Sequence, residues 1–203
     1  MYAETKQLTY PDIPAVDVAT FADRLKLTSD SEYLSEEALL NALLLTASQF
    51  ACNYLNRTLI TATWLRQFSS DDKYTGSLTR LNRGINKYYL PYSPVNKINS
   101  IKLISGEIST EPEEIAITEY LFDNVSEPAV VIIPEIPTGL ERIQIEYEAG
   151  YGDTPESIPE VIKQGILQHA SFMFAFRGDC SAEDSAKQSG AIMIYNSFRV
   201  GVI

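Results

Sequence analysis

The feature that most constrains the fold is a long amphipathic stretch that ends in a strand-like segment, between residues 35 and 64. From residue 36 to residue 55, apolar side chains recur at three- and four-residue steps, which places them on one face of a helix. Such a helix would be roughly 30 Å long at about 1.5 Å per residue, so other elements must pack along it. After Asn56, β-branched residues favour a strand. The apolar positions are Leu40, Leu43, Ala47, Phe50, Ala51 and Tyr54.

Three helices are predicted, at about residues 18–26, 36–55 and 159–177. Ser35 is the expected N-cap of the long helix, because its hydroxyl can accept a hydrogen bond from a free backbone N–H of the first turn. Acidic residues follow it, where the helix dipole favours negative charge. The first two helices should form a helical hairpin. The third, which Pro159 is expected to open, shows an apolar face and is predicted to be a core helix.

A mainly antiparallel β region is predicted between about residues 59 and 149. The clearest strand is 142–149, where apolar and polar residues alternate and so predict one buried and one solvated face. The expected fold class is therefore α+β. Further strand signals lie at residues 58–63, 88–94, 95–104, 120–122 and 129–134.

The domain organisation predicted from these elements is a single α+β domain over residues 17–178. Residues 1–16 are expected to be an extended leader. Residues 179–203 begin as a polar, acidic tether and end as an apolar tail, which has too much apolar surface to stay in water. We expect the tail to be mobile in the free chain, or else to return to its own sheet as an edge strand. An insertion at about residues 69–87 is expected to be a long exposed loop or a loose hairpin.

Composition narrows the function classes. Sixteen basic and 27 acidic residues give a net charge of −11, which disfavours a broad phosphate-binding surface. No apolar run is expected to reach the length of a membrane helix, and the N-terminus lacks the pattern of a signal peptide. Cys52 and Cys180 form neither a disulfide framework nor a zinc site. The expected place of synthesis and residence is a reducing cytoplasm.

Candidate catalytic chemistry is weak. His169 is the only histidine and falls on the apolar face of the last helix, without metal-ligand spacing, so a structural role is favoured. The turn at residues 150–152 lacks the third glycine and the lysine of a phosphate-binding loop. No catalytic residue, cofactor site or metal site is predicted. Two alternatives stay open: an enzyme or ligand-binding domain that uses His169, and a DNA-packaging accessory protein.

Four short motifs follow one another along the chain. The first ends the long helix and enters a strand. The second is a leucine-proline, X, proline-valine segment with one extra residue between the prolines. The third is a tyrosine, X, alanine-glycine-tyrosine-glycine turn with an Ile-Pro helix start, and the fourth is a tyrosine, arginine and valine near the C-terminus. Their residues are Tyr54, Asn56, Arg57, Leu59, Ile60 and Trp64; Leu90, Pro91, Pro94 and Val95; Tyr147, Ala149, Gly150, Tyr151, Gly152, Ile158 and Pro159; and Tyr195, Arg199 and Val200.

In this order the motifs resemble the tailed-phage head-tail connector, or adaptor, family, which is also found in prophages and gene transfer agents. The resemblance implies a structural virion protein that is not an enzyme. Its copies would form a ring, dodecameric like the portal, which joins the portal to a tail-side stopper or terminator protein. DNA would pass through the lumen without specific binding. The sequence departs from the family pattern at the 69–87 insertion and at Phe198, where tyrosine is commoner.

The resemblance also implies that the C-terminal arm binds the portal or a neighbouring subunit. Tyr195 and Phe198 would be its aromatic anchors, and Arg199 would pair with a partner carboxylate. Deleting residues 191–203 should then leave the fold intact. The residues expected to bind a partner are Ile194, Tyr195, Phe198, Arg199, Val200 and Ile203.

Overall fold

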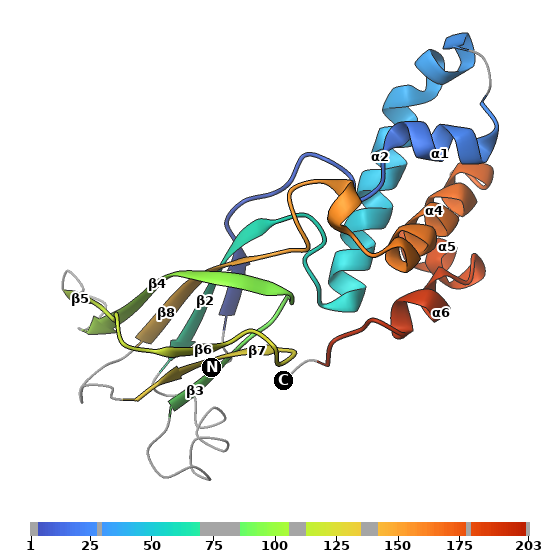
Figure 1. Cartoon of the computed structure of the whole chain (residues 1–203). Coiled ribbons are helices and arrows are strands. Elements are labelled where there is room, and N and C mark those ends of the chain that lie inside the picture. The colour runs from blue at the N-terminus through green and yellow to red at the C-terminus, as the bar shows by residue number, and fades with distance from the viewer. Residues whose placement is uncertain are drawn as a thin grey trace. The chain divides into compact units, whose positions relative to one another are not determined.

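The computed structural model describes residues 4–27, 30–69, 86–105, 113–134, 142–177 and 180–201 (Figure 1). The 69–87 insertion therefore lies almost wholly outside the described residues, as does Ile203. The fold class is α+β, as predicted. The chain divides into two compact units, whereas a single domain was expected. Unit 1 holds residues 1–10 and 62–149, and unit 2 holds residues 11–61 and 150–202.

Unit 1 is a β structure of two antiparallel sheets. The five-stranded sheet has the order β1-β2-β8-β4-β5, and the three-stranded sheet has the order β3-β7-β6. Apolar side chains from both sheets form one core cluster. The strands are β1 (Glu4–Gln7), β2 (Ala62–Ser69), β3 (Asn86–Leu90), β4 (Val95–Ser105), β5 (Glu113–Ala116), β6 (Leu121–Asp123), β7 (Ala129–Ile133) and β8 (Arg142–Ala149).

Strand β8 occupies the centre of the larger sheet and shows the predicted alternation. Its apolar residues are buried, and the residues between them are half-buried on the opposite face. Tyr147 is fully buried, and its hydroxyl donates a hydrogen bond to the carbonyl oxygen of Pro91 at 3.0 Å. Trp64 lies opposite Tyr147 in the β2–β8 register and stacks on Tyr92 at 3.9 Å between ring centroids. Residues of the first three motifs therefore meet here as packing partners.

Unit 2 is helical, and the three predicted helices are present with shifted ends. The long helix begins at Asp30, so Ser35 lies inside the helix and is not its N-cap. Residues 30–34 contain no proline or glycine, so the helix can begin before Ser35. Pro159 is the residue before α4 and not its first residue. The helices are α1 (Val18–Leu25), α2 (Asp30–Leu55), α4 (Glu160–Ala175), α5 (Ala182–Gln188) and α6 (Ala191–Asn196), with a 3-10 turn, η1 (Pro155–Ser157).

The core of unit 2 forms where α2 meets α4. Leu40, Leu44 and Leu55 of α2 are fully buried, whereas the predicted core residue Phe50 is only partly buried. By length and composition, residues 35–55 are apolar enough to cross a membrane, so the expectation that no segment reaches that limit was wrong. One face of this helix packs in the core of unit 2, which gives a reason for its apolar composition. The core helix of a soluble protein can be as long and as apolar as a membrane-spanning helix.

The N-terminal leader contributes to both units. Residues 4–7 form the edge strand β1, which pairs with β2. Ala15 and Val16 are buried in the core of unit 2, and the backbone N–H of Ala15 donates to Ser48 Oγ at 3.0 Å. The segment is thus an integral part of the fold.

The alanine-glycine-tyrosine-glycine turn pairs with the segment that follows α2. The N–H of Tyr151 donates to the Leu59 carbonyl at 3.1 Å, and the N–H of Thr61 donates to the Gly152 carbonyl at 2.9 Å. Gly150 has φ of +144°, and a Cβ there would lie 2.5 Å from the Thr61 Cα. This close approach of two backbones requires glycine.

We predict that Gly150→Ala lowers the free energy of unfolding by about 2 to 3 kcal/mol, because the added methyl group meets backbone that cannot move away. Thermal or denaturant unfolding measures the loss. Gly201→Ala is the matched control, since a Cβ at exposed Gly201 meets nothing within 4 Å. Equal stability of the two variants would contradict the close approach.

Candidate partner-binding segment

The stretch expected to be a polar tether is helical in the structure. Ser181 caps α5, accepting a hydrogen bond from the Asp184 N–H at 3.1 Å. Glu183 and Asp184 lie in the first turn, where the helix dipole favours them. Lys187 pairs with Glu183 at 2.5 Å, one turn along the helix. Local capping and charge order thus fold this acidic stretch, and α6 follows it after one short turn.

Tyr195, expected as an aromatic anchor for a partner, is a core residue of unit 2. It is fully buried, and its ring lies 6.2 Å from Tyr54 and 6.5 Å from Phe50. Gly165 of α4 makes room for it, because a Cβ at Gly165 would lie 2.7 Å from Tyr195 Cε1. Burial raises the pKa of the Tyr195 phenol. In this arrangement Tyr195 holds α6 to α4 and is not presented to another chain.

The residues after α6 are hydrogen-bonded to the end of α2. Asn56 Nδ2 donates to the Val200 carbonyl at 2.9 Å, and Arg57 Nε donates to the Phe198 carbonyl at 2.7 Å. In return, the Val200 N–H donates to the Leu55 carbonyl at 2.9 Å. The first and fourth motifs, more than 140 residues apart in the chain, are therefore in direct contact.

The six predicted partner-binding residues differ in accessibility. Arg199 is exposed, and its guanidinium lies 4.9 Å from the centroid of the Tyr54 ring. Ile194 and Phe198 are partly exposed, whereas Val200 is buried. Among the described members of this set, Arg199, Ile194 and Phe198 can thus meet a partner without unpacking the segment, and their binding role stays a prediction.

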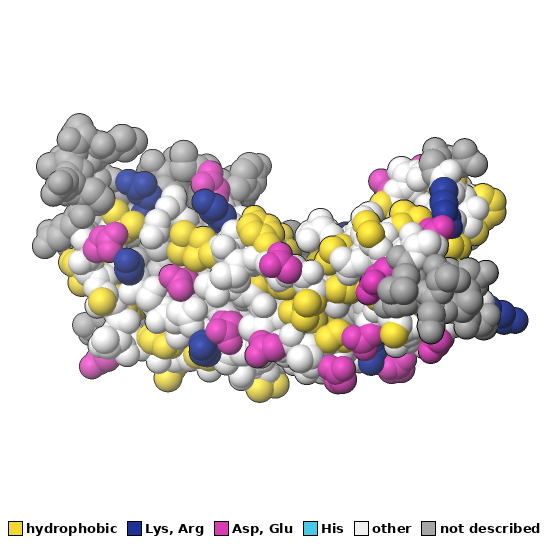
Figure 2. All heavy atoms as spheres, turned by 90° about the horizontal axis from the view of Figure 1, so that it is seen from above, with side chains coloured by type: hydrophobic (Ala, Val, Ile, Leu, Met, Phe, Trp, Pro, Cys, Tyr) yellow, Lys and Arg dark blue, Asp and Glu magenta, His cyan; other side chains and the backbone are white. Residues whose placement is uncertain are grey.

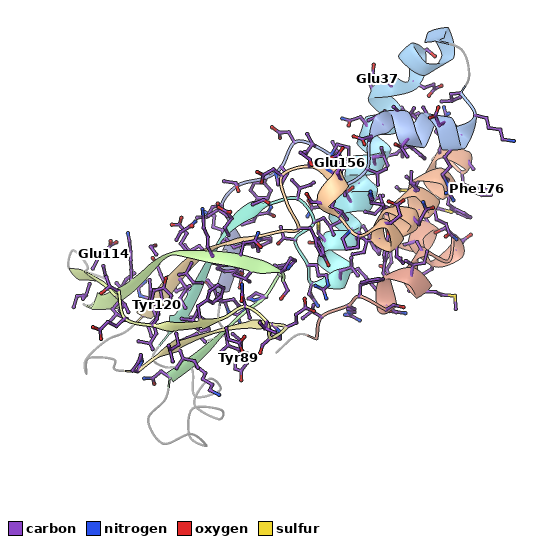
Figure 3. All side chains as sticks on the ribbon, in the orientation of Figure 1. Glu37, Tyr89, Glu114, Tyr120, Glu156 and Phe176 are labelled. Carbon is purple, nitrogen blue, oxygen red and sulfur yellow. The ribbon has the colours of Figure 1, made fainter. Side chains whose placement is uncertain are left out.

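Two exposed apolar side chains of unit 2 were missed by the sequence reasoning. Met193 of α6 is 78% exposed. Phe176, labelled in Figure 3 at the end of α4, is 48% exposed and stacks on Phe172 at 4.4 Å. Both lie in apolar stretches where exposed and buried positions carry the same residue types. The sequence alone therefore does not distinguish the exposed positions from the buried ones.

The structure argues against a detachable tail. Residues 191–200 bring one fully buried aromatic ring and a set of backbone hydrogen bonds to the core of unit 2. Deleting residues 191–203 would expose the partners of that ring on α2 and α4. Loss of stability is therefore expected, contrary to the expectation that the fold would survive the deletion.

His169 is fully buried on α4. Its Nε2 lies 2.7 Å from the Ala182 carbonyl; a carbonyl only accepts, so Nε2 carries the proton and donates. Its Nδ1 is buried without a partner among the described residues, and its ring meets Phe50 edge-on at 5.1 Å. Burial lowers the pKa of His169, which favours the neutral imidazole.

The surroundings of His169 support a structural part. The hydrogen bond to Ala182 ties α4 to the first residue of α5. In the part of the chain that the structure describes, no group of three His, Cys, Asp or Glu residues could hold a metal ion. Cys52 is partly exposed as a residue, but desolvation raises the pKa of its thiol to about 11, so it is not a reactive thiolate at neutral pH.

Comparison with known proteins identifies the fold. No protein-family model and no curated protein match the chain. Solved structures from gene transfer agent (GTA) particles share its fold over 98% of its length at 20% sequence identity. These are the neck of an empty particle computed with C6 symmetry (TM-score 0.71, 97% of that chain covered), the virion of a native particle (0.72, 96%) and the neck of a native particle computed with C12 symmetry (0.65, 97%).

We predict that Gly165→Ala lowers stability by about 1 to 2 kcal/mol. Helix propensity alone would raise it by about 1 kcal/mol, but the new methyl group displaces the Tyr195 ring. Unfolding experiments measure the sign. In a double-mutant cycle, Tyr195→Leu should cost less in the Gly165→Ala background than alone. Additive effects of the two substitutions would contradict the contact.

A second prediction concerns pH. Because the folded-state pKa of His169 lies below the ordinary value of 6.5, the unfolded chain binds more protons as the pH falls through that value. Stability is then fully present above about pH 6.5 and decreases toward acid, with a slope of at most about 1.4 kcal/mol per pH unit from this group. His169→Gln should lower stability at pH 8 and flatten the dependence below pH 6.5. An unchanged slope in the variant would contradict the neutral, buried histidine.

Proposed function

We propose that this protein is a structural head-tail connector, or adaptor, of a virion neck. Copies of the chain form a ring under the portal and join it to a tail-side stopper or terminator protein. The observation that carries the proposal is the end-to-end likeness to chains of the GTA neck, which covers both units at once. The neck structures were computed with C6 and C12 symmetry, and a ring of copies agrees with such symmetry.

The four motifs support a structural role. Each is used for packing: the end of α2 binds the C-terminal segment, and the glycine turn pairs with residues 59–61. The proline segment receives the hydrogen bond of Tyr147. His169 is likewise used for packing, which disfavours the enzyme alternative that relies on it.

The charge agrees with passage of DNA through the ring. The chain carries a net charge of −11, and a lumen lined by carboxylates would not retain phosphates. On the face seen in Figure 2, acidic side chains of the described residues are scattered among apolar and uncharged ones, and basic side chains form no continuous patch. The same charge disfavours the DNA-packaging alternative. The proposed location is the head-tail interface of the virion, after synthesis in the host cytoplasm.

The test is electron microscopy of the purified chain, alone and mixed with the portal protein from the same genome. The proposal expects rings with the chain alone or on the portal, and co-purification of the two proteins. A chain that stays monomeric and does not bind the portal would refute it. A nuclease or hydrolase activity lost on His169→Gln would favour the enzyme alternative instead.

We predict that Arg199→Glu weakens co-purification with the portal while leaving the melting temperature nearly unchanged. Arg199 is exposed, so the reversal of charge removes a possible ion pair with a partner at little cost to the fold. Lys6→Glu, the same charge change at an exposed lysine of β1, is the control. Equal portal binding by both variants would remove Arg199 from the interface.

A further inference from the structure

The long helix α2 is more apolar than its place in the core of unit 2 requires. Residues 35–55 are apolar enough to cross a membrane, yet only 33% of that apolar stretch is buried in this chain. From Ala38 to Asn56 the sequence contains no acidic or basic residue, although charged residues make up 21% of the whole chain. Much of this uncharged helix therefore lies outside the core.

One side of α2 is exposed along about four turns. The exposed residues follow one another at three- and four-residue steps, which places them on one face of the helix. Leu40, Leu44 and Ala47 are fully buried on the opposite face, which packs in the core of unit 2. We call the exposed side the uncharged face of α2. It consists of Ala38, Ala42, Thr46, Gln49 and Asn53, with the half-buried Leu39 and Leu45 on its two flanks.

The short helices α1 and α5 of the same unit expose charged residues instead. On α1 these are Asp23 and Arg24, and on α5 they are Glu183, Asp184 and Lys187. A helix face in contact with water ordinarily carries such residues. The centre of a protein–protein contact is depleted of charged residues. The uncharged face of α2 thus has the composition of a surface that another chain covers.

We propose that the uncharged face of α2 is a contact surface for a second copy of this chain. Each copy carries a net charge of −11, so two copies repel one another wherever their acidic surfaces meet. Along α2 from residue 38 to residue 56 a neighbour meets no acidic side chain of the helix, and this repulsion is smallest there. The choice of a second copy rests on the proposed ring, in which every copy has a neighbour on each side.

The residues of the uncharged face favour a protein neighbour over a lipid bilayer. A helix that lies on a membrane places large apolar side chains in the lipid and lysine or arginine along its polar side. The uncharged face of α2 instead carries small and neutral polar side chains, and the helix has no basic residue between 38 and 56. Small side chains such as Ala42 let a second helix approach closely, and the amides of Gln49 and Asn53 can hydrogen-bond to it.

Glutamate substitutions test the contact, because a carboxylate buried between two chains would have no partner there. Ala42→Glu and Thr46→Glu change the middle of the uncharged face. Ala19→Glu and Thr20→Glu make the same two changes at exposed positions of α1 and are the matched controls. Sedimentation of the full-length protein should show self-association weakened about thirtyfold or more by each α2 variant. The α1 variants should assemble like the parent. For a parent that assembles only on the portal, the number of copies held per portal is compared instead.

Melting temperatures, measured at concentrations where the chain is a monomer, separate folding from assembly. All four positions are exposed, so each variant should melt close to the parent. If both α2 variants melted well below their α1 controls, the uncharged face would be covered within the chain itself, and the proposal would be wrong.

The remaining outcomes separate this contact from the proposed function. Normal assembly of Ala42→Glu and Thr46→Glu, or an equal loss in all four variants, would overturn the α2 contact and leave the ring in place. Flotation of the parent with phosphatidylcholine vesicles, abolished by Ala42→Glu, would identify a membrane as the occupant instead. A parent chain that neither assembles nor binds the portal would refute the proposed function. Loss of assembly confined to the α2 variants would establish the contact.

Discussion

The end of α2 is the constraint on which unit 2 depends. A helix leaves its last carbonyl groups without partners inside the helix, and they must be satisfied elsewhere. Here Asn56 takes a left-handed backbone conformation with φ of +53°, and the Leu55 carbonyl accepts from Val200 at the far end of the chain. The side chains of Asn56 and Arg57 reach the same segment.

This one junction therefore explains why the C-terminal residues are folded. Immediately after it, residues 59–61 pair with the turn at 150–152. The end of α2, the turn at 150–152 and the C-terminal segment are distant in the sequence but are joined by these hydrogen bonds. Substitutions in any of the three stretches therefore act on the same contacts. Parts of the first, third and fourth motifs thus meet at this junction, whereas the proline segment of the second motif contacts Tyr147 in unit 1.

The periodicity of apolar residues predicted the helices and strands that bury one face over several turns or several alternate residues. Leu40, Leu44, Ala47 and Ala51 recur over about three turns of α2. Ile143, Ile145 and Tyr147 alternate along β8, so each pattern repeats often enough to be recognised. The helices α5 and α6 have seven and six residues, too few for a repeat. Ser181 with Asp184 three residues later was a readable cap, but its acidic surroundings favoured a mobile segment.

The candidate site was only partly predictable because its contacts are between distant residues. The burial of Tyr195 depends on Gly165, a helix glycine thirty positions earlier whose role is to have no side chain. Arg66 lies in a stretch whose alternation reads as an ordinary strand, and nothing local distinguishes a solvated arginine from one that faces an apolar layer. Register decides this, and register follows from pairing with β8.

Burial affects the basic groups of His169 and Arg66 in different ways, and the difference follows from pKa. His169 can lose its proton, so burial lowers its pKa and the neutral ring needs only the Ala182 carbonyl as a hydrogen-bond partner. Arg66 cannot do so, because no accessible pH removes the charge of a guanidinium. A neutral histidine thus suits the enclosed core of unit 2, whereas Arg66 of β2 keeps its charge and is only partly buried.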